Sequence, residues 1–343
     1  MTQYDDKIYE EILGELETSF KEGKIDEASY MDLKQRYEKK LAEARVHREE
    51  ARTISSFQVS GSQRVTSDAV KISGSASIPG GVVPKIIKVA GSCRIADDIE
   101  CNGLRVAGSL HSNGAIVSHG DVSVSGSFHG DGILTAEGDV DVSGSCKIGG
   151  DINVTGVVTV SGSMQSDGNI YGKGGIRVYG SGKSDGDMFS ENDIEVKGSV
   201  KVDGDVRANK VKFAAPVVFK RLLRKRARSQ VDGDIIGQES VEIENIHVDG
   251  NVRGRVVIIG RNSKIEGTIE YVDDLQVAED AVLENQPVKV SAETLGVPLQ
   301  APPKTEIKFK TPEALAHPSF CPKCGQEVDK GLKFCPACGA SLE

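Results

Sequence analysis

Glycine or asparagine occupies every sixth residue of a long central stretch, and this period constrains the fold more than any other feature of the chain. The column contains Asn102, Gly108, Gly114, Gly120, Gly126, Gly132, Gly138, Gly144, Gly150, Gly156, Gly162, Gly168, Gly174, Gly180, Gly186, Asn192, Gly198 and Gly204. Both residue types tolerate positive φ, so each member of the column is interpreted as a left-handed corner. A chain that turns a corner every six residues winds into a coil.

The residues between the corners alternate between apolar and polar. A large apolar residue follows each corner by two positions, with Gly182 as the exception, and a small residue follows it by four. The positions one, three and five residues after the corner are mostly polar or charged. This period of two predicts strands of about five residues, with two side chains pointing inward and three toward water.

A longer period of eighteen residues lies on top of the six-residue one. The tetrapeptide Val-x-Gly-Ser begins at Val106, Val124, Val142, Val160, Val178 and Val196. Three six-residue sides therefore close one coil, and the sequence predicts a mainly β fold, a single-stranded triangular β-helix or solenoid. This longer period shortens from eighteen to seventeen residues within the regions Gly74 to Gly108 and Gly233 to Gly267. One five-residue side per coil would produce the shorter period. About a dozen coils ~4.8 Å apart would bury the inward columns in a rod ~55–60 Å long.

Composition agrees with a narrow core and favours the cytoplasm. Tryptophan is absent and aromatic residues make up 5% of the 343 residues. The net charge of −9 argues against a protein that coats nucleic acid. No apolar run approaches the ~18 residues of a membrane span, and the polar, acidic N-terminus predicts no signal peptide. Cys93 and Cys146 fall on the inward column, and free buried thiols suit a reducing compartment.

Residues 1–52 have a different pattern, which predicts a helical hairpin. Apolar residues recur at helical spacing on both sides of a break at Gly23; they are Ile8, Ile12, Leu16 and Phe20, then Tyr30, Leu33, Tyr37 and Leu41. Asp26 is expected to cap the second helix. The stretch from Ile12 to Leu41 is similar to small SHOCT-type oligomerisation modules. The plainer alternative is an amphipathic hairpin that caps or links the rod.

The solenoid is expected over residues 56–284, and its repeat fails at 214–230. This insert carries six cations within nine residues, namely Lys220, Arg221, Arg224, Lys225, Arg226 and Arg228. Apolar residues such as Phe219 and Leu222 accompany them. Because cations near anionic lipid contribute roughly 1 kcal/mol each, the insert favours a peripheral contact with the inner face of the membrane. The alternatives are a solvated loop and, more weakly, a nucleic-acid contact that lacks the usual aromatic residues.

The C-terminal region predicts a tether followed by a metal site. Residues 285–318 hold six of the eleven prolines without periodicity, which indicates a flexible linker. Residues 319–343 contain two C-x-x-C-G knuckles, whose cysteines are Cys321, Cys324, Cys335 and Cys338. Four thiolates at this spacing predict tetrahedral structural Zn²⁺, which would supply the folding energy of a segment too short for a core. The segment resembles small zinc ribbons, and a redox C-x-x-C pair is the alternative.

Histidine and aspartate columns on the predicted solenoid surface are candidates for further sites. His111 and His129, eighteen residues apart, are expected to stack on adjacent coils facing solvent, with His119 on another side. The three cannot meet at one metal within a chain, so a site between subunits is the remaining alternative for His111 and His129. The outward column of Asp167, Asp185 and Asp203 is expected to pair with the lysines two residues before Asp185 and Asp203 rather than to bind calcium.

The repeated Gly-Asp-Ile/Val units resemble the bactofilins, a family of polymer-forming bacterial cytoskeletal proteins. They include runs 138–145, 150–152, 202–206 and 265–269. The resemblance spans about residues 59–284 and implies a right-handed β-helix whose rods join end to end without nucleotide. The hairpin, the basic insert and the zinc ribbon are departures from that family.

Three functions follow from these features. The first is a cytoplasmic, non-enzymatic scaffold that self-associates through the ends of the solenoid and recruits partner proteins. The second is an adaptor in which the zinc ribbon binds protein or nucleic acid and the solenoid is a spacer. The third, least favoured, is a hexapeptide-type transferase, which would need a histidine in a cleft between neighbouring rods.

Overall fold

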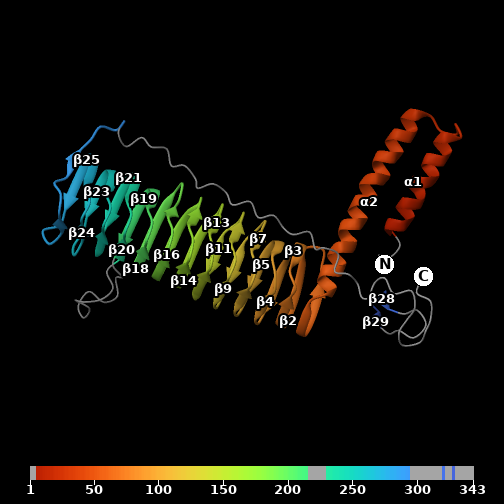
Figure 1. The fold of residues 1–343 in the computed structure, drawn as a ribbon, viewed down its shortest axis with the longest axis horizontal. Coiled ribbons are helices and arrows are strands. Elements are labelled where there is room, and N and C mark those ends of the chain that lie inside the picture. The colour runs from red at the N-terminus through yellow and green to blue at the C-terminus, as the bar shows by residue number, and fades with distance from the viewer. Residues whose placement is uncertain (1–4, 215–228, 294–318, 321–326, 329–343) are drawn as a thin grey trace. The chain divides into compact units, whose positions relative to one another are not determined.

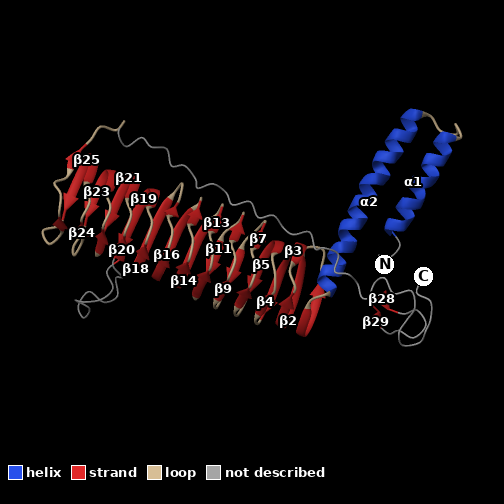
Figure 2. Ribbon diagram, viewed as in Figure 1, coloured by secondary structure: helices blue, strands red, loops and turns tan. Residues whose placement is uncertain are grey.

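The predicted β-solenoid and the two N-terminal helices are both present. The computed structural model describes residues 5–214, 229–293, 319–320 and 327–328. The chain divides into two units, residues 1–305 and 306–343, and each is described by itself. The first unit contains the helices and a parallel β-solenoid of about twelve coils (Figures 1 and 2). The mainly β fold class is therefore confirmed, while the handedness of the coil stays a prediction.

The N-terminal helices form the expected hairpin. Helix α1 spans Asp5–Lys21 and helix α2 spans Glu27–Ser55. Between them Gly23 adopts a left-handed φ of 71°. Asp26 caps α2, because its carboxylate accepts hydrogen bonds from the backbone N–H of Ser29 at 2.9 Å and from its hydroxyl at 2.7 Å. The rings of Phe20 and Tyr30 stack across the hairpin with centroids 4.3 Å apart.

Three ladders of parallel strands form the three faces of the solenoid. Some strands are confined to one face. Those on face I are β8 (Val122–Val124) and β11 (Val140–Val142). Those on face II are β4 (Cys93–Ile95), β6 (Leu110–Ser112), β9 (Phe128–Gly130), β12 (Ser145–Ile148), β20 (Ser229–Val231), β22 (Ile246–Val248), β24 (Lys264–Ile265) and β26 (Val282–Leu283). Those on face III are β7 (Ile116–Ser118), β10 (Leu134–Ala136), β13 (Ile152–Val154), β15 (Ile170–Gly172), β17 (Met188–Phe189) and β27 (Val288–Lys289).

Longer strands run round a corner from one face to the next. Those that pass from face I to face II are β2 (Ala69–Ile78), β14 (Val157–Ser166), β16 (Gly175–Ser184) and β18 (Asp193–Val202). Those that pass from face III to face I are β3 (Gly81–Ala90), β5 (Ile99–Val106), β19 (Val206–Ala214), β21 (Ile235–Ile243), β23 (Val252–Ile259) and β25 (Ile269–Val277). Strand β1 (Gln58–Val65) lies against β2 and is the antiparallel member of this sheet among the described strands.

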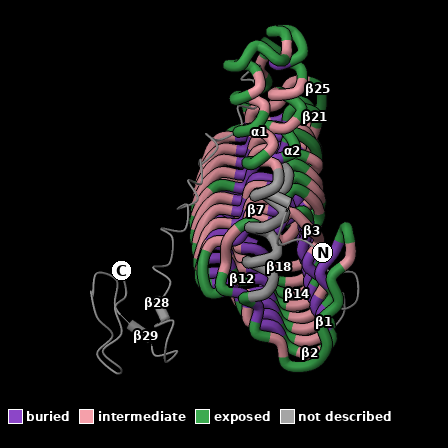
Figure 3. Tube along the Cα trace, turned by 90° about the vertical axis from the view of Figure 1, so that its right-hand side faces the viewer, coloured by how far each residue is buried: buried purple, intermediate pink, exposed green. Residues whose placement is uncertain are grey.

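The hydrophobic core is a continuous column along the solenoid axis. Val140, for example, pairs with Val122 in the preceding coil and Val158 in the following one, a spacing of eighteen residues. The three residues of most short strands are buried, partly exposed and buried in turn, so the inward positions of successive coils line up (Figure 3). Buried serines such as Ser118 donate to a corner carbonyl, here that of Gly120 at 2.8 Å.

The glycine column is required for two reasons, of which positive φ is only one. Gly180, at the corner between faces I and II, has a φ of 144°, and a Cβ there would overlap the carbonyl oxygen of Gly162. Gly204, at the corner between faces II and III, has no such φ. A Cβ on Gly204 would instead overlap the carboxylate of Asp187 from the preceding coil. The interpretation of every column member as a left-handed corner is therefore wrong, and close approach between coils explains glycines such as Gly204.

The same carboxylates explain the recurrent Gly-Asp pairs. Asp187 accepts a hydrogen bond from the backbone N–H of Asp205, one coil later, at 2.8 Å. Asp205 accepts one in turn from Asp234 at 2.7 Å. Asparagine serves in the same position, since Asn169 Oδ1 accepts from the N–H of Asp187 at 2.9 Å. This inter-coil ladder satisfies backbone donors at corners where the strands are interrupted.

Substitution of Asp187 tests the inter-coil ladder. We expect Asp187→Asn to leave the free energy of unfolding unchanged, because the amide oxygen keeps the acceptor. Asp187→Ala is expected to lower it by about 1 kcal/mol, the typical net value of one hydrogen bond. Chemical denaturation measures both variants. Asp141→Ala is the matched control, because Asp141 lies exposed on face I away from the corner ladder. An equal loss in Asp187→Asn and Asp187→Ala would contradict this role.

Candidate functional site: the C-terminal end of the solenoid

The last coil, formed by β25, β26 and β27, leaves the end of the hydrophobic core partly open. Val277 and Val282 are 41% and 53% exposed. Leu275 and Leu283 are only partly buried, although they pack against the core. One coil earlier, the residues that pair with Leu275 and Val277 are Val257 and Ile259, which are fully buried. The apolar positions are therefore the same in both coils, and only the covering coil differs.

The outer edges of the three last strands carry unpaired backbone groups. Each pairs on its inner side with the preceding coil, as Ile265 does with Leu283. Within the described residues, no strand pairs with the outer side of β26, of β27 or of the face I part of β25 (residues 274–277), whereas Glu270 and Tyr271 of β25 pair with β27. A row of free N–H and C=O groups beside apolar side chains is a template for a further strand. A groove of about 700 Å³ opens beside this end, and Val277, Ile259 and Glu244 are among the residues that line it.

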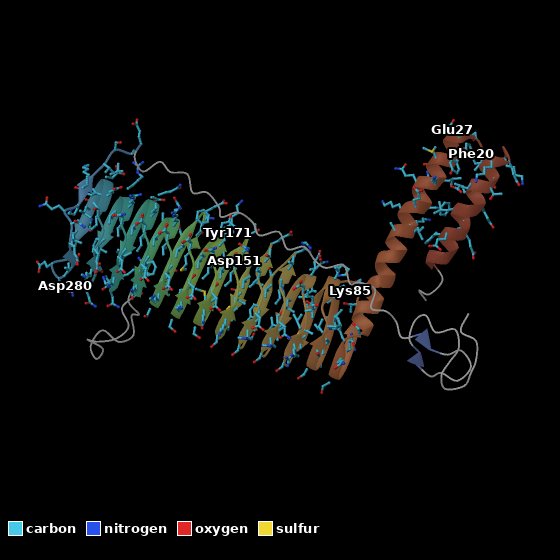
Figure 4. The ribbon with its side chains drawn as sticks, in the orientation of Figure 1. Phe20, Glu27, Lys85, Asp151, Tyr171 and Asp280 are labelled. Carbon is cyan, nitrogen blue, oxygen red and sulfur yellow. The ribbon has the colours of Figure 1, made fainter. Side chains whose placement is uncertain are left out.

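The N-terminal end of the solenoid is covered differently. Strand β1 runs antiparallel along β2, so that Val59 lies opposite Ala76 and packs against the core. The remaining residues of β1 are exposed and mostly polar, including Ser60, Ser62 and Arg64. The two ends are therefore chemically unlike, with a polar strand at one and an apolar coil at the other. The last coil also carries the exposed acidic residues Asp274, Glu279 and Asp280, of which Asp280 is labelled at this end in Figure 4.

Face II carries a ladder of alternating charges, as the aspartate column predicts. The amines of Lys183 and Lys201 form ion pairs with Asp185 and Asp203, respectively. These pairs lower the pKa of Asp203, and they raise the pKa of Lys183. Asp167 accepts a hydrogen bond from Gln165 at 3.2 Å instead. The column is thus a charge-paired surface rather than a row of free carboxylates.

The histidines lie where the eighteen-residue period places them. The rings of His111 and His129 stack with centroids 5.0 Å apart and planes 2° from parallel, and His129 also lies 3.1 Å from Asp131. His119 is on face III instead. Its ring nitrogens lie 2.9 Å from Glu100 and 3.1 Å from Glu137, and these two carboxylates raise the pKa of His119.

A further cluster on face II was not found by sequence reasoning. His247 Nε2 lies 3.3 Å from Asp249 and 2.9 Å from Glu266, so the three could approach a metal ion. Lys264 already supplies a cation there, 2.5 Å from Glu266 and 2.8 Å from Glu284. The seventeen-residue spacing of His247 and Lys264, the length of one coil here, was the sequence signal that could have indicated this cluster. The cluster continues the charge ladder of face II.

The buried thiols lie inside the solenoid. Cys93 and Cys146 occupy the inward column as expected, and Cys101 is buried as well. Burial raises the pKa of Cys93 and Cys146 to about 12 and that of Cys101 to about 11. The thiolate is the reactive form, so these groups are unreactive at neutral pH.

The four zinc-ligand candidates and the six cations of the basic insert lie outside the described residues. Two short strands flank the first knuckle: β28 (Ser319–Phe320) pairs antiparallel with β29 (Glu327–Val328). The intervening connection holds Cys321 and Cys324, and Cys335 and Cys338 follow. A set of four thiols in two matching knuckles fits tetrahedral Zn²⁺, with the metal closed to further ligands.

Comparison with known proteins supports a zinc ribbon at the C-terminus. A family model described as a zinc-ribbon domain matches residues 320–342. Neither the curated proteins nor the solved structures give a match to this chain. Among the described helices, none is long and apolar enough to cross a membrane.

Thiol reactivity separates the two classes of cysteine. In the zinc-loaded protein we expect none of the seven thiols to react rapidly with a disulfide reagent at neutral pH. After addition of a strong chelator we expect four thiols to react, because removal of the metal exposes the ribbon cysteines. The remaining three should react only after denaturation. Reaction of a solenoid thiol in the native protein, or of all four ribbon thiols without chelator, would contradict this assignment.

Proposed function

We propose that the protein is a structural scaffold that self-associates through the C-terminal end of its solenoid. The carrying observation is the last coil, whose apolar positions and strand edges lack the cover that every internal coil has. Addition of another strand would bury Val277, Leu275 and Leu283 and pair the free backbone groups. Such an interface needs no nucleotide.

The resemblance of the Gly-Asp-Ile/Val repeats to bactofilins supports end-to-end polymers as the assembled form. Polymerisation of this kind uses shape and edge pairing rather than turnover, so we propose a cytoskeletal, non-enzymatic role. We place the scaffold in the cytoplasm, at the inner face of the membrane, because free buried thiols suit a reducing compartment. The cations of the insert favour anionic lipid.

The N-terminal hairpin and the zinc ribbon would recruit partner proteins to the scaffold. A second candidate function is an adaptor whose zinc ribbon binds protein or nucleic acid while the solenoid acts as a spacer. The family match at residues 320–342 favours this candidate. A pull-down with Cys321→Ser tests it, because loss of the metal site would remove a partner held by the ribbon.

The central test is self-association of the full chain, measured by light scattering after size-exclusion chromatography and by electron microscopy. We expect wild-type protein to form concentration-dependent assemblies. Val277→Asp should weaken assembly at least about tenfold, because a carboxylate would be buried unpaired in the new interface. The half-exposed position lets the isolated monomer remain folded.

Val117→Asp is the matched control, since Val117 is a partly exposed valine on face III in the internal strand β7. It should assemble as the wild type does. Monodisperse monomers of the wild type at every salt and protein concentration would overturn the proposed function. Equal assembly of Val277→Asp and wild type would overturn the assignment to this end.

A further inference from the structure

Four cationic side chains form one column on face I at the N-terminal end of the solenoid. Lys71 in β2 pairs with Lys88 in β3, and Lys88 pairs with Arg105 in β5. Arg64 in β1 lies opposite Lys71. Neighbouring strands are ~4.8 Å apart, so four positive charges follow one another along roughly 15 Å of the axis. We call these four residues the basic column.

Two members of the basic column, Lys71 and Lys88, differ from the lysines of face II in lacking acidic partners. Among the described residues, Lys71 and Lys88 form no ion pair, while Arg105 lies 3.5 Å from Asp121. Asp68 is near enough that both lysines help to lower its pKa, after the larger effect of its hydrogen bond to Thr66. On face II, by contrast, Lys183 and Lys201 each have a carboxylate two residues later. Like charges stacked without partners repel one another, and an anionic surface would relieve this.

Small side chains beside the basic column leave a shallow groove. Two residues after Lys71, Lys88 and Arg105 the chain carries Ser73, Ala90 and Ala107, whereas two residues after Lys183 and Lys201 of face II it carries Asp185 and Asp203. The groove has a volume of about 330 Å³ and is lined by Lys71, Lys88 and Arg105 together with these small residues and by Ser123 and Ser125. Nothing large or acidic in the lining separates the cations from an approaching anion.

The edge beside this groove is also the edge from which the basic insert leaves the solenoid. Ala214 pairs with Lys197, directly before the glycine corner between faces I and II. Beyond the insert, Ser229 Oγ accepts a hydrogen bond from the N–H of Val200 on the other side of that corner. The basic column itself extends along roughly 15 Å of one face, so an extended anionic surface matches it better than a compact ligand does.

We propose that face I at the N-terminal end is a docking surface for anionic lipid bilayers, with Lys71, Lys88 and Arg105 contacting the headgroups. The site lacks the exposed aromatic rings that would stack nucleic-acid bases. Contact by basic side chains near a charged membrane surface is electrostatic and falls with ionic strength. The site does not depend on self-association, so a monomer binds by the same face.

Flotation of the full-length protein with vesicles tests the proposal. The vesicles contain phosphatidylcholine alone or phosphatidylcholine with about one-third phosphatidylglycerol. We expect binding to the anionic vesicles only, weakening as salt is raised. Lys71→Glu with Lys88→Glu should reduce vesicle binding at least about tenfold. Both side chains point away from the core, and a thermal melt checks that the variant is folded.

The matched control is Arg94→Glu with Lys147→Glu, which changes the net charge equally at exposed positions on face II, outside the groove. It should bind anionic vesicles far better than Lys71→Glu with Lys88→Glu. Equal loss in the two variants would show a dependence on net charge alone and overturn the site. Unchanged binding by the Lys71 and Lys88 variant would also overturn it, as would wild-type protein that binds single-stranded DNA but not vesicles. Loss of self-association with vesicle binding intact would overturn only the scaffold.

Discussion

Hydrogen bonding between successive coils is the constraint on which the rest of the structure depends. A single coil cannot bury its inward side chains or pair the backbone groups on its edges. Both require another coil above it and another below it. The strand ladders and the corner ladder of Asp187, Asp205 and Asn169 provide these contacts along the axis. Stacking of this kind has no internal stop, and each end must be covered by something else.

The two ends meet this requirement in different ways, and the difference gives the molecule its direction. Strand β1 covers the first coil with a polar antiparallel strand, whereas β25, β26 and β27 leave Val277 and Val282 half exposed. Stacking also aligns the outward residues of successive coils in columns on the surface. On face II Lys183 and Lys201 form ion pairs with aspartates, whereas Lys71 and Lys88 on face I form no ion pair within the described residues. The surface therefore differs from face to face and from end to end.

The sequence was sufficient for the fold because its period was unusually regular. The six- and eighteen-residue periods predicted the three faces and the inward columns, and Asp26 marked the start of α2. The reason for most glycines was not predictable. At Gly204 it depends on the Asp187 carboxylate of the neighbouring coil, seventeen residues earlier in the chain.

The sequence predicted uncapped solenoid ends, but which end is open and the presence of the basic column were missed for a related reason. Exposure of Val277 and alignment of Lys71 with Lys88 are properties of stacked coils, and neither has a local motif. The zinc ligands were predicted from local spacing alone, and the family match to residues 320–342 agrees with that prediction.

Residue-resolved amide hydrogen exchange tests the central claim, that coil stacking protects the interior and leaves the C-terminal coil open. In dilute monomer we expect slow exchange in β14, β16 and β18 and fast exchange along the outer edges of β26, of β27 and of residues 274–277 in β25, which do not pair with β27. As assembly proceeds, those outer-edge amides should slow to the rates of the interior strands. Equal protection of the last coil and the interior coils in the monomer would contradict the account.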